Sequence, residues 1–228
     1  MLALLQPKPN ESVGLPVLLH RLVWLLGCWV QDLEDGLRPQ IYDAMVRIIN
    51  DNSEASDVRV KLTCVQTLNV LCEDWNFMVA AFRPLAARAV GGMYALLEEI
   101  YGIEMMTLIL ETCRVIVLRM GDELGVEAAN AVVAPLLGIW TRCADGKSIL
   151  RKYVLSILTG IVDVVGCNEA LQLYPVVMPM LDVSVCEGVD VSFYAWFCYF
   201  YVASFHGLRC ARSLTHHLLK FNFFRSVD

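Results

Sequence analysis

The fold is decided by the stretch SDVRVKLTCVQTLNVLCEDW, residues 56–75. Its apolar residues recur every three or four positions, which places them on one stripe of an amphipathic helix. Ser56 or Asp57 is positioned to cap the first turn, because the first amides of a helix have no partner within the helix. The stretch therefore predicts a helix that ends in an acidic corner containing a tryptophan. The residues of the stripe are Val58, Leu62, Val65, Leu68 and Leu71.

A second amphipathic helix is predicted just before this one. The segment LRPQIYDAMVRII, residues 37–49, carries Pro39 near its start, where the missing N–H of proline costs nothing. A polar link, NDNSEAS, joins it to the helix that follows. Two helices joined by so short a link predict an antiparallel helical hairpin.

The hairpin pattern recurs along the chain. The predicted first helices begin at residues 37, 82, 126 and 173, so that they are 45, 44 and 47 residues apart. A two-helix unit with a period in the forties is typical of HEAT or armadillo repeats, and the broad apolar faces suit helices that must cover neighbours on both sides. An all-α bundle with helix–loop–helix pairs is the alternative. We expect an all-α solenoid over residues 1–183, with a half unit at 15–30, units near 37–75, 82–121 and 126–166, and a partial unit from 173.

The composition narrows the class of protein. A hydrophobic content of 57% with 18% charged residues excludes a disordered chain. Nine cysteines, an odd count without a CxxC pair, favour reduced, intracellular cysteines used as small hydrophobic residues over a disulfide framework. The start of the chain, MLALLQPKPNES, lacks the pattern of a secretory signal.

The charge is acidic and unevenly distributed. Residues 1–190 hold 23 of the 24 acidic side chains and 14 of the 18 basic ones. Nucleic-acid binding is not expected, because phosphate contacts need clustered lysines and arginines. The acidic net charge is compatible with basic protein partners.

No pattern for catalysis or for a cofactor is found. The sequence contains no GxxxxGK[ST], GxSxG or HExxH motif. His20 stands alone on an apolar stripe, and His216 and His217 are adjacent, so they point to different faces of a helix. Cys64 and Cys72 are predicted to be packing residues. We expect neither an enzyme nor a bound metal or cofactor.

The order of several motifs resembles a known family. The segments RLVWLLGCWVQDLEDGLRPQIYDAMVRIINDN (21–52) and DVRVKLTCVQTLNVLCEDWNF (57–77) are similar to the importin-β superfamily of nuclear transport receptors, and most of all to its importin-eleven branch. LLGIW (136–140) and LYPVVMPML (173–181) fit the same pattern. The resemblance covers about residues 18–183 and is carried by Trp24, Gly27, Trp29, Leu37, Arg38, Pro39, Tyr42, Val58, Arg59, Asp74 and Phe77.

The resemblance implies a Ran-dependent receptor that carries protein cargo through the nuclear pore. Its partners would be cargo, Ran-GTP and nucleoporins, and its location the nucleus, the cytoplasm and the nuclear envelope. Nothing in the sequence resembles the family's Ran-binding region, so an internal segment of a longer receptor or a truncated gene model is expected. A HEAT-repeat scaffold without a transport role is the alternative, and a membrane-anchored helical protein is a more distant one.

Charged residues on the predicted second helices are the candidates for partner contacts. A stack of hairpins offers a long surface built from second helices, and we expect these residues at exposed positions on it. A solvated helix face is the alternative interpretation for each of them. The candidates are Lys61, Glu73, Glu111, Arg114, Arg151 and Asp163.

The tail, residues 184–228, departs from the repeat pattern. VSFYAWFCYFYVASF (191–205) holds no charge and is dense in aromatics, and basic residues follow it. A bilayer span needs about 20 apolar residues, which this run does not reach. A misread frame, an irregular final helix and a membrane anchor remain open interpretations.

Overall fold

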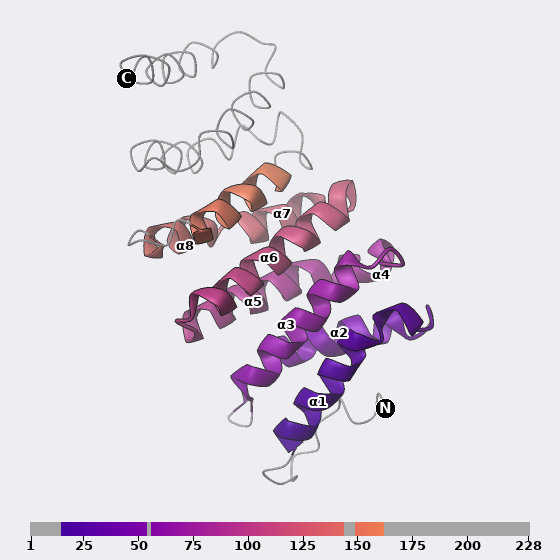
Figure 1. Ribbon diagram of the computed structural model, residues 1–228. Helices are drawn as coiled ribbons and strands as arrows, with labels where there is room; N and C mark the ends of the chain where they lie inside the picture. The colour runs from indigo at the N-terminus through magenta and orange to yellow at the C-terminus, as the bar shows by residue number, and fades with distance from the viewer. Residues whose placement is uncertain (1–14, 54–55, 144–148, 162–228) are drawn as a thin grey trace, which may run out of the picture. The chain divides into compact units, whose positions relative to one another are not determined.

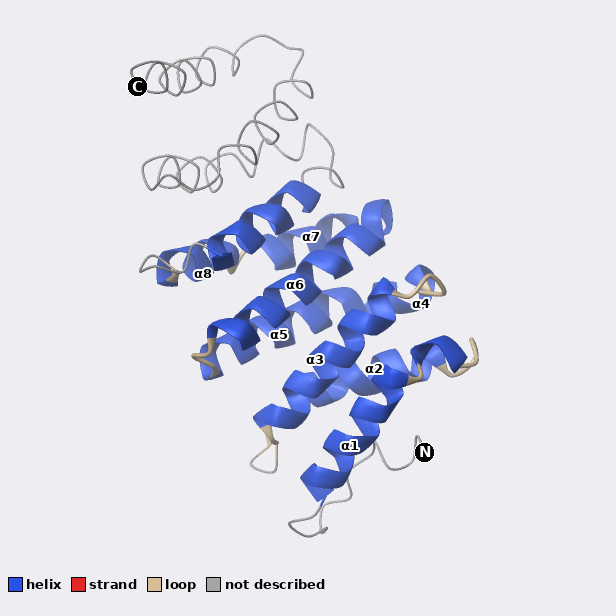
Figure 2. Cartoon of the chain, in the orientation of Figure 1, coloured by secondary structure: helices blue, strands red, loops and turns tan. Residues whose placement is uncertain are grey.

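The computed structural model describes residues 15–53, 56–143 and 149–161. All of them belong to the first of the two compact units into which the chain divides, Met1–Val165. Within these residues every regular element is a helix and no strand occurs (Figure 2). The expected all-α class is confirmed for this part of the chain. Asp163, the partial unit from residue 173 and the tail 184–228 lie outside the described residues.

The helices follow one another through short connections (Figure 1). Residues 149–161 form a further helix without a label. The labelled elements are α1 (Leu15–Cys28), η2 (Val30–Asp32), α2 (Arg38–Ile49), α3 (Val58–Glu73), α4 (Val79–Phe82), η3 (Arg83–Leu85), α5 (Ala86–Glu99), α6 (Ile103–Met120), η4 (Gly121–Leu124), α7 (Gly125–Val133) and α8 (Leu136–Arg142).

The helices pack in two rows. In one row α2 packs on α5 and α5 on α7, and in the other α1 packs on α3 and α3 on α6 (Figure 1). The hairpin partners α2 and α3, and likewise α5 and α6, pack across the two rows. Helix 149–161 continues the second row, because Gly160 lies against Val117 of α6. We call α1, α3, α6 and helix 149–161 the second-helix row.

Neighbouring helices keep a constant register along both rows. Four polar contacts, two in each row, join residues that are 44 or 45 positions apart. Each helix is therefore offset from its neighbour in the row by nearly the same number of residues. The contacts are Thr67 to the carbonyl of Val23, Arg88 to Asp43, Arg119 to the carbonyl of Asp74, and Arg142 to Glu98.

Helix α3 begins where its sequence indicates, and three of the five residues of its predicted stripe are buried. Of the two cap candidates, Asp57 is the cap: its Oδ1 accepts a hydrogen bond from the Arg59 amide at 2.7 Å. Val65, Leu68 and Leu71 are completely buried. Val58 and Leu62, also predicted in the stripe, are only half-buried, whereas Cys64, Thr67 and Cys72 beside it are buried. The buried surface is wider than the stripe because α3 packs against α1, α2 and α6.

Two helices that the sequence predicts as continuous are interrupted. The first helix predicted to begin at residue 126 is divided between α7 and α8 at Pro135, because proline has no N–H to donate to the carbonyl one turn earlier and its ring clashes with that carbonyl. The first helix predicted to begin at residue 82 is preceded by helical turns that begin at Val79, and the chain tightens to a 3₁₀ turn around Pro84 before α5. In both places the proline, rather than the apolar periodicity, sets the boundary.

Two adjacent glycines of α5 are expected to respond in opposite directions to substitution by alanine. A Cβ on Gly92 would lie 2.6 Å from Nδ2 of Asn50. That Nδ2 donates to the carbonyls of Val46 at 2.8 Å and Arg88 at 3.2 Å. Gly92→Ala would displace the amide, and the loss of two hydrogen bonds at about 1 kcal/mol each exceeds the helix-propensity gain of about 1 kcal/mol. We expect Gly92→Ala to lower the free energy of unfolding by about 1 kcal/mol.

Gly91 is the matched control, since a Cβ there meets nothing within 4 Å. Gly91→Ala is expected to raise the free energy of unfolding by about 0.5–1 kcal/mol, measured by urea denaturation followed by circular dichroism. In the Asn50→Ala background, Gly92→Ala should no longer lower the free energy of unfolding, because the amide that the new Cβ would displace is absent. Equal effects of the two alanines in the wild-type background would contradict the close approach of Gly92 to Asn50.

Candidate functional site

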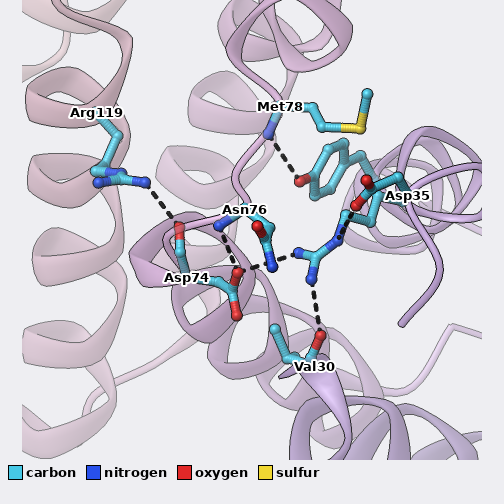
Figure 3. A network of polar contacts seen from close by, with 8 residues as sticks. Val30, Asp35, Asp74, Asn76, Met78 and Arg119 are labelled. Carbon is cyan, nitrogen blue, oxygen red and sulfur yellow. Dashed lines mark hydrogen bonds and ion pairs between the residues drawn. The ribbon is translucent and has the colours of Figure 1, made fainter. Parts of the chain in front are cut away.

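A buried arginine holds together the corner where η2, α2 and the end of α3 meet. Arg38, at the start of α2, is completely buried. Its Nη2 donates to the carbonyl oxygen of Val30 at 2.9 Å, its Nη1 lies 3.4 Å from Oδ1 of Asp74, and its Nε lies 3.6 Å from Oδ1 of Asp35. Figure 3 shows Val30, Asp35 and Asp74 converging on one guanidinium. One side chain thereby connects segments that are separated in the sequence.

Asp74 extends this corner to the next unit. Its side chain is only 5% exposed, and its Oδ1 also accepts a hydrogen bond from the Asn76 amide at 2.7 Å. Its carbonyl oxygen accepts a hydrogen bond from Nη2 of Arg119, on α6, at 2.7 Å. The corner therefore fixes the position of α3 relative to both neighbouring units.

Three aromatic rings fill the space beside the guanidinium. The ring of Tyr42 packs edge-on against Phe77 and Phe82, with centroid distances of 5.7 and 5.5 Å. The Tyr42 hydroxyl oxygen accepts a hydrogen bond from the Met78 amide at 3.3 Å. Burial raises the pKa of Tyr42, so the phenol stays neutral. The Arg119 guanidinium lies 5.7 Å from the centroid of Phe77.

This corner gathers residues that carried the family resemblance. Arg38, Tyr42, Asp74 and Phe77 are all buried or nearly so, and they contact one another or a shared neighbour. Buried groups of this kind have no surface to offer a partner. Their contacts hold the helices in register, so their role in this structure is to position the surface around them.

Two of the predicted contact residues are not exposed. Lys61 is buried, with its Nζ 3.9 Å from Oε1 of Glu99 at the end of α5. Arg151 is buried as well, with its guanidinium 4.7 Å from the ring centroid of Trp140. The prediction of exposed positions is wrong for both. Long side chains bury their aliphatic parts where neighbouring helices cover them, while the charged end reaches a carboxylate or an aromatic face.

Three other predicted residues lie on one surface. Glu73 is exposed, and Glu111 and Arg114 of α6 are half-buried and paired, at 2.6 and 2.9 Å. The hydrogen bonds that Arg114 donates to the carboxylate of Glu111 raise the pKa of Arg114, and the carboxylate of Glu73 raises it further. Arg114 thus lies within electrostatic reach of Glu73 on α3. Glu73 and the Glu111–Arg114 pair therefore lie on two neighbouring helices, α3 and α6.

This surface extends over the second-helix row. Residues 45 apart on α1, α3 and α6 occupy equivalent positions, because the helices pack in constant register. Exposed or half-buried side chains fill these positions, and together they define what we call the second-helix face. Its residues are Arg21, Gln66 and Glu111; Trp24, Asn69 and Arg114; Leu25 and Val70; and Cys28, Glu73 and Leu118.

The face combines apolar and charged side chains along the row. Trp24 and Leu25 on α1 are 48% and 44% exposed, and Val70 on α3 is 38% exposed. On α6 the Glu111–Arg114 pair lies on the same face as Leu118, which is 49% exposed. The sequence reasoning selected charged residues and missed this apolar part. The register of 45 residues is the signal that would have placed Trp24 beside Asn69.

The cysteines do not form a site in the described residues. Cys64, Cys72 and Cys113 are completely buried, and burial raises the pKa of each thiol. The prediction that Cys64 and Cys72 are packing residues is confirmed. Within residues 15–53, 56–143 and 149–161, no group of metal-ligating side chains comes together, and no helix is long and apolar enough to cross a membrane.

No protein-family model, curated protein or solved structure matches this chain.

Proposed function

We propose that this chain is a protein-binding α-solenoid segment, of the HEAT or armadillo type, from a Ran-dependent nuclear transport receptor. Such a receptor carries protein cargo through the nuclear pore and is found in the nucleus, the cytoplasm and the nuclear envelope. Its partners are cargo proteins, nucleoporins and Ran-GTP, the last through a region outside this chain.

The observation that carries the protein-binding part is the second-helix face. Two rows of helices in constant register bring side chains from α1, α3 and α6 into one area. This area combines exposed apolar groups, Trp24, Leu25 and Val70, with charged groups such as Glu73. Apolar groups interspersed with a few charges are typical of protein interfaces, whereas catalysis needs converging titratable groups.

The transport part rests on the sequence resemblance. Its support from the structure is indirect: Arg38, Tyr42, Asp74 and Phe77, which carry the resemblance, act together at one corner. Residues that depend on one another in this way form a coherent pattern rather than scattered matches. A helical-repeat scaffold without a transport role would have the same architecture, so the test must address Ran.

The test uses purified Ran and the full-length gene product. A nuclear transport receptor of this class is expected to bind Ran loaded with a non-hydrolysable GTP analogue far more tightly than Ran loaded with GDP, and to change its association with cargo when Ran-GTP is added. Affinity is measured by isothermal titration, with the two nucleotide forms as mutual controls. Equal or absent binding of the two forms would reject the transport part and leave a scaffold.

A further inference from the structure

The turn between α5 and α6 presents a tyrosine to the solvent. Tyr101 is 88% exposed, whereas Tyr42 and Tyr94 are buried and Tyr153 is half-buried. The turn lies at one end of the α5–α6 hairpin (Figure 1). Among the described residues, no hydrogen bond or ring contact involves the Tyr101 side chain. Its hydroxyl is therefore accessible to an enzyme, and its ring is not needed for packing.

The backbone around Tyr101 is extended rather than helical. The turn consists of residues 100–102, and its outer residues have extended torsions: φ −117° and ψ 148° at Ile100, φ −74° and ψ 125° at Gly102. Of the eight residues 98–105, all but Ile100 are exposed. An enzyme that modifies a side chain must also admit the residues on both sides of it into its active-site groove. An exposed turn between two helices allows this without unfolding of the chain.

The charge around Tyr101 is entirely negative. Glu98 and Glu99 precede the tyrosine and Glu104 follows it, and all three are exposed. Residues 89–113 contain no lysine, arginine or histidine. Because complementary charge favours the encounter of two proteins, an enzyme that accepts this turn needs a positively charged groove.

We propose that Tyr101 is phosphorylated by a protein tyrosine kinase with a positively charged substrate groove. The hydroxyl oxygen of Tyr101 attacks the γ-phosphorus of ATP, and a new O–P bond forms. The bond from that phosphorus to the oxygen it shares with the β-phosphorus breaks, and the phenolic proton passes to a carboxylate base of the kinase. The products are phosphotyrosine and ADP. The inference depends neither on Ran nor on the second-helix face.

The folded chain is expected to retain its stability with the phosphate in place. The exposed ring leaves the phosphate in water, so no charge is buried. The phosphate adds about two negative charges, which the neighbouring carboxylates disfavour and the N-terminus of α6 favours. The midpoint of urea denaturation should therefore be the same before and after phosphorylation. The modification changes the surface and not the fold.

Phosphorylation of the purified chain tests the inference. The probe is ATP with a tyrosine kinase domain that is active on the acidic copolymer poly(Glu,Tyr). Tandem mass spectrometry locates the phosphate, and quantification over time gives the rate at each tyrosine. We expect Tyr101 to be phosphorylated faster than Tyr153, and Tyr42 and Tyr94 to remain unmodified. Tyr101→Phe should lose the phosphate at this position and remain folded, because the ring is not packed.

Two double variants with the same change in net charge test the role of the carboxylates. Glu98→Gln with Glu99→Gln should lower kcat/KM for phosphorylation of Tyr101 about tenfold. Asp32→Asn with Glu34→Gln removes two exposed carboxylates at other positions of the chain and should leave this value unchanged. A synthetic peptide of residues 95–107 should be phosphorylated at a rate similar to that of the folded chain.

Three results would each overturn the inference. The first is no phosphate on Tyr101 in the folded chain, whether or not the peptide is phosphorylated. The second is phosphorylation of Tyr153 as fast as that of Tyr101, and the third is an equal rate for the two double variants. Binding of Ran is measured without a kinase, so each of the two proposals can fail without the other.

Discussion

Asp74→Ala is expected to lower the free energy of unfolding by about 3 kcal/mol, because it leaves the guanidinium of Arg38 buried without its closest carboxylate. Removing one partner of a buried ion pair costs far more than the pair itself contributes, since the remaining charge has lost its contact with water. The carbonyl of Val30 and the distant carboxylate of Asp35 remain, but they do not replace a carboxylate 3.4 Å away. Urea denaturation followed by circular dichroism measures the loss.

Asp35→Ala is the matched control. Asp35 also pairs with Arg38, at 3.6 Å, but its side chain is 79% exposed. Exposed ion pairs contribute about 0–1 kcal/mol, so this variant should lower the free energy of unfolding by at most about 1 kcal/mol. Asp74→Asn removes the charge but keeps an oxygen that can accept the hydrogen bond from the Asn76 amide. The difference in the free energy of unfolding between Asp74→Asn and Asp74→Ala therefore measures the contribution of that hydrogen bond, and the remaining loss measures that of the charge.

A double-mutant cycle completes the test. In an Arg38→Met background there is no buried guanidinium for Asp74→Ala to leave without its carboxylate, so Asp74→Ala should then cost much less than it does in the wild type. Identical costs in the two backgrounds would show that the pair does not stabilise the corner. The same cycle with Arg119→Met should leave the cost of Asp74→Ala unchanged, since Arg119 binds the backbone carbonyl of residue 74 and not its carboxylate.

The second large effect is expected at Phe82. Its ring is completely buried and contacts the rings of Tyr42 and Phe77, each at a centroid distance of 5.5 Å. Phe82→Ala should lower the free energy of unfolding by about 3–5 kcal/mol, the sum of lost burial and the cavity left behind. Phe82→Leu fills most of that volume and loses the aromatic contacts, so about 1–1.5 kcal/mol is expected.

The control for Phe82 is a larger aromatic residue in the same region. Trp75 follows directly after Asp74 and is 87% exposed. Trp75→Ala should therefore change the free energy of unfolding by no more than about 0.5 kcal/mol. Thermal and urea denaturation of the three variants measure the differences. A loss at Trp75 as large as that at Phe82 would contradict the burial on which both expectations rest.

Periodicity and caps made much of the helical structure predictable. The recurrence of apolar residues at three and four positions requires a helix with one buried side, and a residue such as Asp57 fixes where it begins, since few side chains accept the first amides. The break at Pro135 has an equally local cause, a missing donor and a steric clash, which the apolar periodicity alone does not show.

The candidate site was less predictable. Lys61 and Glu73 lie on the same helix and look alike as charged residues of a second helix, yet one is buried and the other exposed. The difference depends on whether a neighbouring helix covers the position, and the sequence of a single helix does not show which positions its neighbours cover. The apolar part of the second-helix face was missed for the same reason, since Trp24 and Leu25 have the sequence character of core residues.

By itself the sequence determined the all-helical class, a helix cap at either Ser56 or Asp57, and the use of Cys64 and Cys72 in packing. These features depend on interactions within a turn or on the preference of a small apolar side chain for the interior. Only the tertiary structure decided that Arg38, Tyr42, Asp74 and Phe77 meet at one corner, and that Arg21 and Trp24 of α1 lie on one exposed face with Gln66 and Asn69 of α3. Such contacts join residues more than thirty positions apart, and their geometry is set by how whole helices pack rather than by any local pattern.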